Sequence, residues 1–350
     1  MANDVCLVTL LLGYAALFWW AFRTLPQEDW QFLASLPTHK DDHGAWSGLN
    51  LTYYGFLTAT AVTIAVGVGV VLMGSLSLPL ISVMSLVGAL LALTVPAARL
   101  VARAVEHKMN TFTIGGASFV GLIAAPWVIA LINATLAPRM GFELPMFGTL
   151  ALLSIAYALG EGTGRLACIS FGCCYGIPVL AASSRWSRLF RARHFAFVGQ
   201  TKKVAYEGGL ERVPIIPVQA ITAVLYVGSG LVGLALFLGG HQVAAFVTTI
   251  VITQMWRALS ELLRADYRGR SGLSAYQTMA LIAVVYAVIL AGLLPSERRA
   301  LPDILHGFTL LWHPGVILSL QAVWVTIFLY TGRSRVTAAT ITFSVLKDRI

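Results

Sequence analysis

Long apolar runs divide this chain into segments of membrane-spanning length. A helix needs about 20 predominantly apolar residues to cross a bilayer. The pattern predicts nine such helices, at residues 5–22, 52–75, 78–98, 114–137, 146–168, 217–239, 242–263, 273–294 and 316–331. The last of these is open to a second interpretation, in which the stretch from Ile304 to Leu311 forms an interfacial helix instead.

Composition agrees with this pattern and changes the class of protein considered. The 350 residues are 58% hydrophobic and 11% charged, whereas a soluble domain carries about 25% charged residues. The sequence therefore predicts an all-α polytopic membrane protein and excludes a soluble enzyme with a single anchor. The first apolar run lacks a basic leader and a small-residue cleavage site, so we expect a retained span and not a signal peptide.

Two long connections are polar. Residues 23–50 contain Trp30 and Trp46, which we expect to act as interfacial anchors. Residues 170–213 are rich in arginine and lysine, and the stretch RWSRLFRARHFAF (185–197) mixes basic and aromatic residues at helical spacing. This predicts an amphipathic helix lying on the headgroup layer.

The nine spans place nearly all basic residues on one side of the membrane. Of the 24 lysines and arginines, only Arg139, Arg298 and Arg299 fall on the other side. The positive-inside rule predicts that the basic side is cytoplasmic. A face that binds anionic lipid would show the same excess for a different reason, so both interpretations stay open.

Arg165 stands at the end of an apolar run, beside Gly160, Gly164 and Glu161. A cation near hydrocarbon costs roughly 2.5–3.5 kcal/mol on insertion scales, which makes Arg165 a candidate for binding an anionic headgroup. The glycines permit a close backbone approach or a break in the helix. The alternative is a simple i,i+4 ion pair with Glu161 at a helix end.

A second basic cluster is formed by Arg257, Glu261 and Arg264, which would share one face of a helix. Two guanidinium groups on either side of a carboxylate suit a phosphate, because the glutamate fixes the fork of one arginine while the other grips the oxygens. The alternative is a ladder of salt bridges at the membrane edge, with Arg264 snorkelling to the surface.

Three further motifs are weaker. Gln219 follows Pro217 in the first turn of a span, and an amide buried there needs a partner. Gly115, Gly116 and Ser118 open another span. Close helix packing is the alternative for both motifs. Tyr54 stands at the start of a third span, where an aromatic belt is the alternative.

Three of the four cysteines, Cys168, Cys173 and Cys174, lie within seven residues. Adjacent cysteines do not readily form a disulfide with each other, and neither a metal-type Cys/His spacing nor a neighbouring histidine is present. Cys173 and Cys174 as nucleophiles are the alternative, which would need a lowered thiol pKa and access to the thiol. Packing is favoured for the cysteines, and no metal or cofactor is expected.

The order of the motifs is more specific than any one of them. Tyr54-Gly55, GGASFVG, GRLACISFGCCYG, PIIPVQ, RALSELLRAD and SAYQTM follow one another along the chain. This order resembles the prolipoprotein diacylglyceryl transferase family, whose pattern runs YG, GGxxFHG, GRxGCFxxGCCYG, PxQLYE and RFxxExxR. The resemblance covers about residues 51–294.

The resemblance implies a seven-helix core that holds phosphatidylglycerol in a lateral cavity, with a basic insert at 170–213. Residues 1–50 would add an N-terminal helix and polar loop, and residues 295–350 a C-terminal helix and tail. The family moves a diacylglyceryl group onto the lipobox cysteine of a preprolipoprotein and releases glycerol phosphate. Carried over by position, Arg165, Arg257 and Glu261 would be catalytic. The implied substrate-binding residues are Tyr54, Gly115, Gly116, Ser118, Gly164, Gln219 and Arg264.

Two departures affect the acceptor half of the implied site. The histidine of GGxxFHG, a natural general base for a thiol, is Val120 here, and the glutamate of PxQLYE is Thr222. His107, His194 and His241 are the spare histidines, and none stands in a matched motif. The half that grips phospholipid is kept, whereas the half that activates an acceptor is changed.

The sequence therefore predicts a multi-pass transferase of a bacterial cytoplasmic (inner) membrane that uses an anionic phospholipid as donor. The acceptor is a lipoprotein cysteine or, as Val120 favours, a sugar, a glucan or another small polar molecule. A non-catalytic phospholipid-binding or lipid-moving protein on the same scaffold is the alternative. A solute transporter ranks last because no inverted repeat is recognisable, and no nucleic-acid partner is expected.

Overall fold

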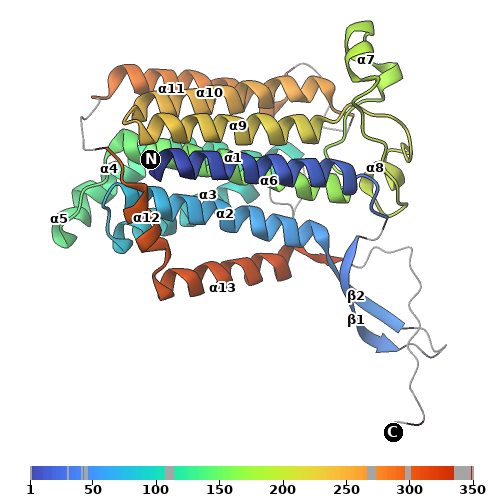
Figure 1. Cartoon of the computed structure of the whole chain (residues 1–350), viewed down its shortest axis with the longest axis horizontal. Helices are drawn as coiled ribbons and strands as arrows, with labels where there is room; N and C mark the ends of the chain where they lie inside the picture. The colour runs from blue at the N-terminus through green and yellow to red at the C-terminus, as the bar shows by residue number, and fades with distance from the viewer. Residues whose placement is uncertain are drawn as a thin grey trace.

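The molecule is a bundle of long helices, which a computed structural model describes over residues 2–29, 31–40, 42, 46–106, 114–265, 273–295, 301–334 and 348. Within these ranges nine helices are long and apolar enough to cross a membrane. They are α1 (Ala2–Thr24), α2 (Tyr53–Ser75), α3 (Leu80–Glu106), α4 (Ile114–Thr135), α6 (Met146–Phe171), α9 (Val218–Leu238), α10 (Gln242–Ser260), α11 (Ala275–Leu293) and α13 (Pro314–Thr331). The predicted all-α polytopic class is confirmed (Figure 1).

Shorter elements connect the spans. The helical ones are α5 (Ala137–Met140), η1 (Val179–Ala181), α7 (Ser184–Phe190), α8 (Lys203–Tyr206), η2 (Glu261–Leu263) and α12 (Ile304–Leu311). Two expectations need correction. The amphipathic helix of the basic insert is short, because it ends at Phe190 and does not continue to residue 197. The stretch from Ile304 to Leu311 is a helix in addition to α13, and not in place of it.

A small sheet stands where a polar loop was predicted. Strand β1 (Phe32–Lys40) pairs antiparallel with β2 (Trp46–Thr52), and β3 (Arg333–Ser334) adds to the other side of β2. The chain passes from β2 directly into α2, whose first turn is capped by the Thr52 hydroxyl accepting from the Gly55 amide. The hairpin lies at one end of the bundle together with α7 and α8 (Figure 1). Trp30 lies outside the described residues.

Helix α6 is the buried centre of the bundle and packs between α2 and α9. Its glycines make close contact possible: a Cβ at Gly160 would stand 2.6 Å from the Ala65 Cβ of α2, and one at Gly162 would stand 2.8 Å from the Val227 Cγ2 of α9. The helix runs without a break from Met146 to Phe171. Of the two possibilities considered for these glycines, the helix has no break and the close backbone approach is present, so their small size serves helix packing.

The C-terminal helices α12 and α13 both pack on α2. Gly55 meets Gly332 and Gly74 meets Gly307 so closely that neither pair leaves room for a Cβ. The Trp324 indole also donates a hydrogen bond to the Thr60 hydroxyl, at 3.1 Å. These contacts cover one flank of the bundle.

Candidate functional site

The predicted site residues come from helices whose relevant ends lie at the hairpin end of the bundle (Figure 1). Helices α6 and α10 end there, and α2, α4, α9 and α11 begin there. Arg165 and Arg257 stand in the closing turns of α6 and α10. Tyr54, Gly115 and Gln219 stand in the first turns of α2, α4 and α9. Residues from distant parts of the sequence thus share one end of the bundle.

Arg165 is mostly buried and forms an ion pair with Glu161, one turn earlier on α6. Its side chain is 14% exposed and that of Glu161 is 7% exposed. The i,i+4 pair considered from the sequence is therefore present. It does not use the whole guanidinium, because the buried Nε has no hydrogen-bond partner in the described part of the chain. A buried donor left in this state costs about 1–3 kcal/mol, so Arg165 keeps the capacity to bind an anion.

Arg257 is held in a different way. Its guanidinium lies against Gly115 of α4, where an added Cβ would overlap Nη2 and stand 2.9 Å from Cζ. It also lies over the Tyr276 ring of α11, 5.6 Å from the ring centroid. Over the described residues, Arg257 forms no ion pair. Gly115 thus lets α4 pack closely against the side chains of α10 and α11, and one of the side chains it accommodates is a cation.

Tyr226 of α9 links the helices that carry the two arginines, because a Cβ at Gly162 of α6 would stand 3.1 Å from the Tyr226 Cβ. Its hydroxyl donates to the Thr253 carbonyl oxygen at 3.0 Å, and its ring lies 5.9 Å from that of Tyr157. Tyr226 interacts electrostatically with both Arg165 and Arg257, and the two arginines act on one another. The two arginines are thus within electrostatic range of each other, and a bound anion would reduce the repulsion between them.

Glu261 and Arg264 are not arranged as predicted. Helix α10 ends at Ser260, Glu261 lies in the 3-10 turn η2, and Arg264 is extended. The shared helical face is therefore wrong for these two residues. Arg264 Nη1 lies 3.9 Å from Glu261 Oε1, and the Arg264 backbone forms an isolated bridge with Gly176. Glu261 thus faces Arg264.

Gln219 and Tyr54 flank the turn that follows α6. The Gln219 side-chain amide donates to the Cys173 carbonyl oxygen at 2.9 Å, while its buried Oε1 has no partner among the described residues. The Tyr54 ring meets Phe171 edge-on, 5.5 Å between centroids. Tyr54 also interacts electrostatically with Arg165 and with the three neighbouring cysteines.

The remaining predicted residues lie nearby on α4 and α6. The Ser118 hydroxyl donates to the Gly115 carbonyl oxygen on its own helix, at 3.1 Å. Gly116 is buried. Gly164 faces α2, where an added Cβ would make an ordinary contact of 3.7 Å with Ala61. The position of Gly164 favours helix packing over substrate contact.

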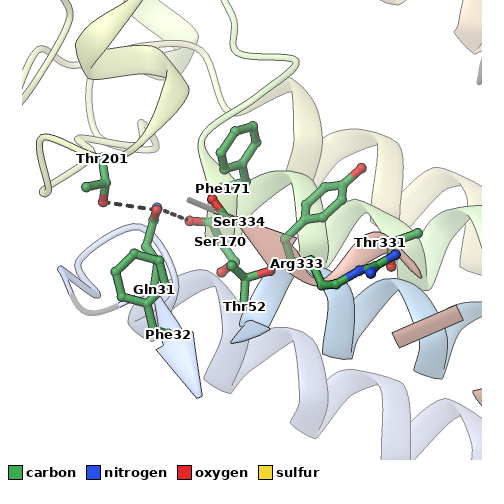
Figure 2. A pocket seen from close by; sticks show the side chains of 10 residues that line it. Gln31, Phe32, Thr52, Ser170, Phe171, Thr201, Thr331, Arg333 and Ser334 are labelled. Carbon is green, nitrogen blue, oxygen red and sulfur yellow. Dashed lines mark hydrogen bonds between the residues drawn. The ribbon is translucent and has the colours of Figure 1, made fainter. Parts of the chain in front are cut away.

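Two cavities reach this region. One, of about 270 Å³, lies between the hairpin and the end of α6, and Figure 2 shows the side chains that line it. Tyr54, Phe171 and Arg333 are among them. The other, of about 160 Å³, lies among α3, α4, α6, α10 and α11 and is lined mostly by apolar side chains together with Ser118, Tyr157 and Gln254.

A buried lysine was not expected from the sequence. Lys202 is fully buried, and its ammonium group donates to the carbonyl oxygens of Leu25 and Ser170, at 2.8 and 2.9 Å. Burial lowers the pKa of Lys202 to about 8, against the opposing charges of Glu28 and Asp29. Ser170 lies in the last turn of α6, so Lys202 also binds the negative end of that helix. Its run of polar neighbours gave no sign of burial.

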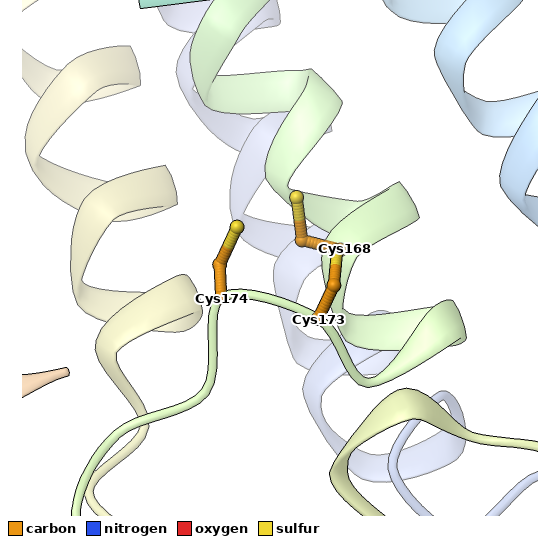
Figure 3. A group of neighbouring side chains, drawn as sticks. All are labelled: Cys168, Cys173 and Cys174. Carbon is orange, nitrogen blue, oxygen red and sulfur yellow. The ribbon is translucent and has the colours of Figure 1, made fainter. Parts of the chain in front are cut away.

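A cluster of thiols was also not expected. The sulfur atoms of Cys168, Cys173 and Cys174 all lie within 4.8 Å of one another (Figure 3). Hydrogen bonds with the other two thiols hold the pKa of Cys174 well below its ordinary value, and the charges of Arg264 and Arg165 act in the same direction. The only signal in the sequence was the helix end before Gly172, which allows Cys168 to meet the residues after the turn.

Neither changed family position supplies a base. Val120 lies on α4, and Thr222 accepts a hydrogen bond from the Trp256 indole, at 2.9 Å, while donating to the Val218 carbonyl oxygen. Of the spare histidines, exposed His194 lies beside the Arg191 carbonyl oxygen, and His241 precedes α10 at the opposite end of the bundle. His107 lies outside the described residues.

Comparison with known proteins adds one match. The family model described as prolipoprotein diacylglyceryl transferase matches residues 45–293, which is most of the chain. In the comparison with curated proteins, no sequence matches this chain. The matched region contains every site residue described above.

Proposed function

Because the chain belongs to the prolipoprotein diacylglyceryl transferase family, we propose that it takes a diacylglyceryl group from an anionic phospholipid such as phosphatidylglycerol. The observation that supports this proposal is that Tyr226 contacts both helices that carry the arginines, α6 near Gly162 and α10 at Thr253, so that Arg165 and Arg257 share one region of the bundle. Two cations that act on one another at the end of a buried helix suit the phosphate that joins a phospholipid headgroup to its glycerol.

The two arginines would contribute in different ways. When the glyceryl carbon–oxygen bond breaks, negative charge grows on the departing phosphate, and fixed donors at that oxygen stabilise the transition state. Arg257 forms no ion pair among the described residues, so the part of its guanidinium that does not lie against Gly115 and Tyr276 would bind the phosphate. Arg165 offers Nε while Glu161 holds its other end. Glu261 would position Arg264 at the edge of the proposed phosphate site, and Tyr54 and Gln219 would line the site.

The apolar cavity supports a lipid donor. Ser118 of its lining stands one turn from Gly115, and Gln254 stands one turn before Arg257. A phospholipid whose phosphate lay at the arginines would direct its acyl chains toward this cavity. The cavity is too small for two whole chains, so the remainder of each chain would lie among the lipids outside the bundle.

We infer the orientation of the site from the family, and the charge of the site is compatible with it. We place the protein in a bacterial cytoplasmic membrane, with the hairpin end on the extracytoplasmic side as in the family. The excess of lysine and arginine at that end then reflects binding of anionic lipid. The basic side chains of α7, such as Arg185 and Arg188, are exposed and suited to a headgroup layer.

The acceptor is a lipoprotein cysteine or a different nucleophile. Valine at position 120 cannot accept a proton, which favours a sugar, a glucan or another small polar acceptor unless a further group activates a thiol. The rival function is a phospholipid-binding or lipid-moving protein without chemistry, and Val120 together with the Glu161–Arg165 pair supports it.

The test is release of glycerol phosphate from phosphatidylglycerol by the purified protein, with a cysteine peptide or a sugar as acceptor. Arg257→Ala and Arg165→Ala should each lower the rate by about 10²–10³, the usual cost of removing one such donor. Arg139→Ala is the control, because this exposed residue lies at the opposite end of the bundle. Phospholipid binding without release for any acceptor would support the non-catalytic function.

Restoring the missing base separates the acceptor classes. Val120→His should raise transfer to a cysteine peptide if the protein is a diverged lipoprotein-modifying enzyme. Unchanged transfer to the peptide, with turnover of a sugar acceptor, would assign the chain to a non-lipoprotein substrate.

A further inference from the structure

Three thiols gather at the end of α6, beside the proposed phosphate site. Cys168 is in the last turn of α6, and Cys173 and Cys174 follow Gly172 in the turn. Their sulfur atoms all lie within 4.8 Å of one another. In a tetrahedral zinc site with Zn–S bonds of about 2.3 Å, neighbouring sulfurs stand about 3.8 Å apart. Small side-chain rotations therefore suffice for the three sulfurs to share one ion.

The backbone of the turn is shaped to place two adjacent cysteines on one side. Gly172 closes α6 at φ 70°, and Cys174 itself is left-handed at φ 56°. A residue other than glycine held in this region costs roughly 1–3 kcal/mol, and such strain concentrates at functional sites. Figure 3 shows the Cys174 side chain turned toward the end of α6, on the side of Cys168.

The surrounding contacts hold this turn. The Cys173 amide donates to the Cys168 carbonyl oxygen at 3.1 Å, and Gln219 binds the Cys173 carbonyl oxygen at 2.9 Å. Gly176 lies so close to the Ile216 carbonyl oxygen that no Cβ fits. The three cysteines are half-buried and not fully enclosed.

The charges nearby suit an anionic metal complex. Three thiolates and one Zn²⁺ carry a net charge of about −1. Arg165 interacts electrostatically with Cys168 and Cys174, and Arg264 interacts with Cys174. Two guanidinium groups therefore offset the charge of the complex. Packing alone would not require three sulfurs to converge beside two cations.

We propose that Cys168, Cys173 and Cys174 bind Zn²⁺ through three thiolates, and that the fourth position of the ion takes the thiol of the acceptor. Three protein ligands and one open position are the arrangement of catalytic zinc sites. A thiol that coordinates Zn²⁺ is deprotonated, which is the task that Val120 cannot perform. The inference rests on the proposed function and names its acceptor as a thiol.

The step balances as follows. The acceptor thiol binds Zn²⁺ and gives its proton to water. Its sulfur attacks the glyceryl carbon of the phospholipid, so that an S–C bond forms while the C–O bond to phosphate breaks. The electron pair leaves with the phosphate oxygen, and glycerol phosphate departs from Arg165 and Arg257. A thiol suits this ion better than a hydroxyl. Three thiolate ligands lower the Lewis acidity of Zn²⁺, and a free thiol already ionises near pKa 8.5.

Cobalt substitution tests the metal site without relying on turnover. The purified full chain, reduced and freed of metal, is titrated with Co²⁺. We expect one tetrahedral Co²⁺ per chain with thiolate charge-transfer absorption, and its displacement by Zn²⁺. Cys168→Ser and Cys174→Ser should each weaken Co²⁺ binding by more than the roughly 10–100-fold that loss of a ligand's supporting group costs. Cys6→Ser is the matched control, because Cys6 lies near the start of α1 at the other end of the bundle.

A cysteine peptide then tests the open position. Its addition should increase the charge-transfer absorption as a fourth thiolate binds. Absence of a thiolate band, equal Co²⁺ binding by the Cys168→Ser variant, or a band that the peptide leaves unchanged would each overturn the inference. If the wild-type protein shows no thiolate band but still turns over phosphatidylglycerol, the zinc site alone is rejected. If the wild-type protein shows the band but no turnover, the proposed function is rejected.

Discussion

The two ends of the helical bundle satisfy their polar groups in different ways. At the short-turn end, where α4 leads through α5 to α6, Asn133 donates to the Leu144 carbonyl oxygen and accepts from the Leu144 amide, at 2.8 and 2.9 Å. Only the Thr149 hydroxyl is buried there without a partner among the described residues. At the hairpin end, Arg165 Nε and Gln219 Oε1 lack a partner within the part of the chain that the structure describes.

This difference distinguishes structural from functional use of polar residues. A buried charged donor without a partner is costly, and a protein retains it where a ligand completes the set. At the short-turn end the half-buried amide of Asn133 has both its donor and its acceptor paired with Leu144, as in a structural cap. At the hairpin end, a buried donor of Arg165 and a buried acceptor of Gln219 have no partner among the described residues, so a ligand would complete their hydrogen bonds. Substitutions at the first end should therefore change stability, and those at the second should change activity.

The largest effect is expected from a single methyl group at the hairpin end. Gly115→Ala would place a Cβ on the Arg257 guanidinium and displace it from Tyr276. Glycerol phosphate release should fall by about 10²-fold, close to the effect of Arg257→Ala. Gly88→Ala is the matched control, because a Cβ at that position in α3 meets nothing within 4 Å. Equal rates for the two variants would contradict the role given to Gly115.

A smaller effect, on stability, is expected from the buried lysine. The folded pKa of Lys202 is about 8, below its ordinary value of 10.5, so the folded state disfavours the charged form. The unfolded chain then binds more protons between these values, and stability from this group rises as the pH increases from 8 to 10, by on the order of 2 kcal/mol. Melting curves of the wild type and Lys202→Met in detergent should differ by this slope. A parallel pH dependence would refute it.

The smallest effect belongs to the short-turn end. Asn133→Ala removes both hydrogen bonds to Leu144 and should lower the free energy of unfolding by roughly 1–3 kcal/mol. Phosphatidylglycerol turnover should remain that of the wild type at temperatures where the variant is folded. A large loss of turnover together with an unchanged melting temperature would reverse the distinction between the two ends.

The spans could be predicted from the sequence because uninterrupted apolar runs determine them. Helix α3 alone extends well past its predicted end, from residue 98 to Glu106, because Arg99, Arg103 and Glu106 interrupt the apolar stretch without ending the helix. The sheet could not be predicted in this way. Pro37 interrupts β1, and few residues of either strand are β-branched, so neither strand has the pattern typical of a strand.

The site could be predicted in its residues and not in its contacts. The order of motifs named Arg165 and Arg257, but no local pattern shows that Gly115 makes room for Arg257. The thiol cluster depends on a left-handed backbone at Cys174, a conformation that residue type rarely dictates. Lys202 was missed because its burial comes from carbonyl groups distant in the sequence.

The bond between Lys202 and the Leu25 carbonyl oxygen also bears on how the protein is made. The two residues are 177 positions apart, and at about 5–20 residues per second the ribosome needs roughly 9–35 s to add that length. During this interval α1 has been synthesised while the lysine that fastens its end has not. The hydrogen bond that holds the end of α1 therefore forms late in synthesis. In nascent chains arrested before residue 202, α1 should be more accessible to lipid than in the finished protein.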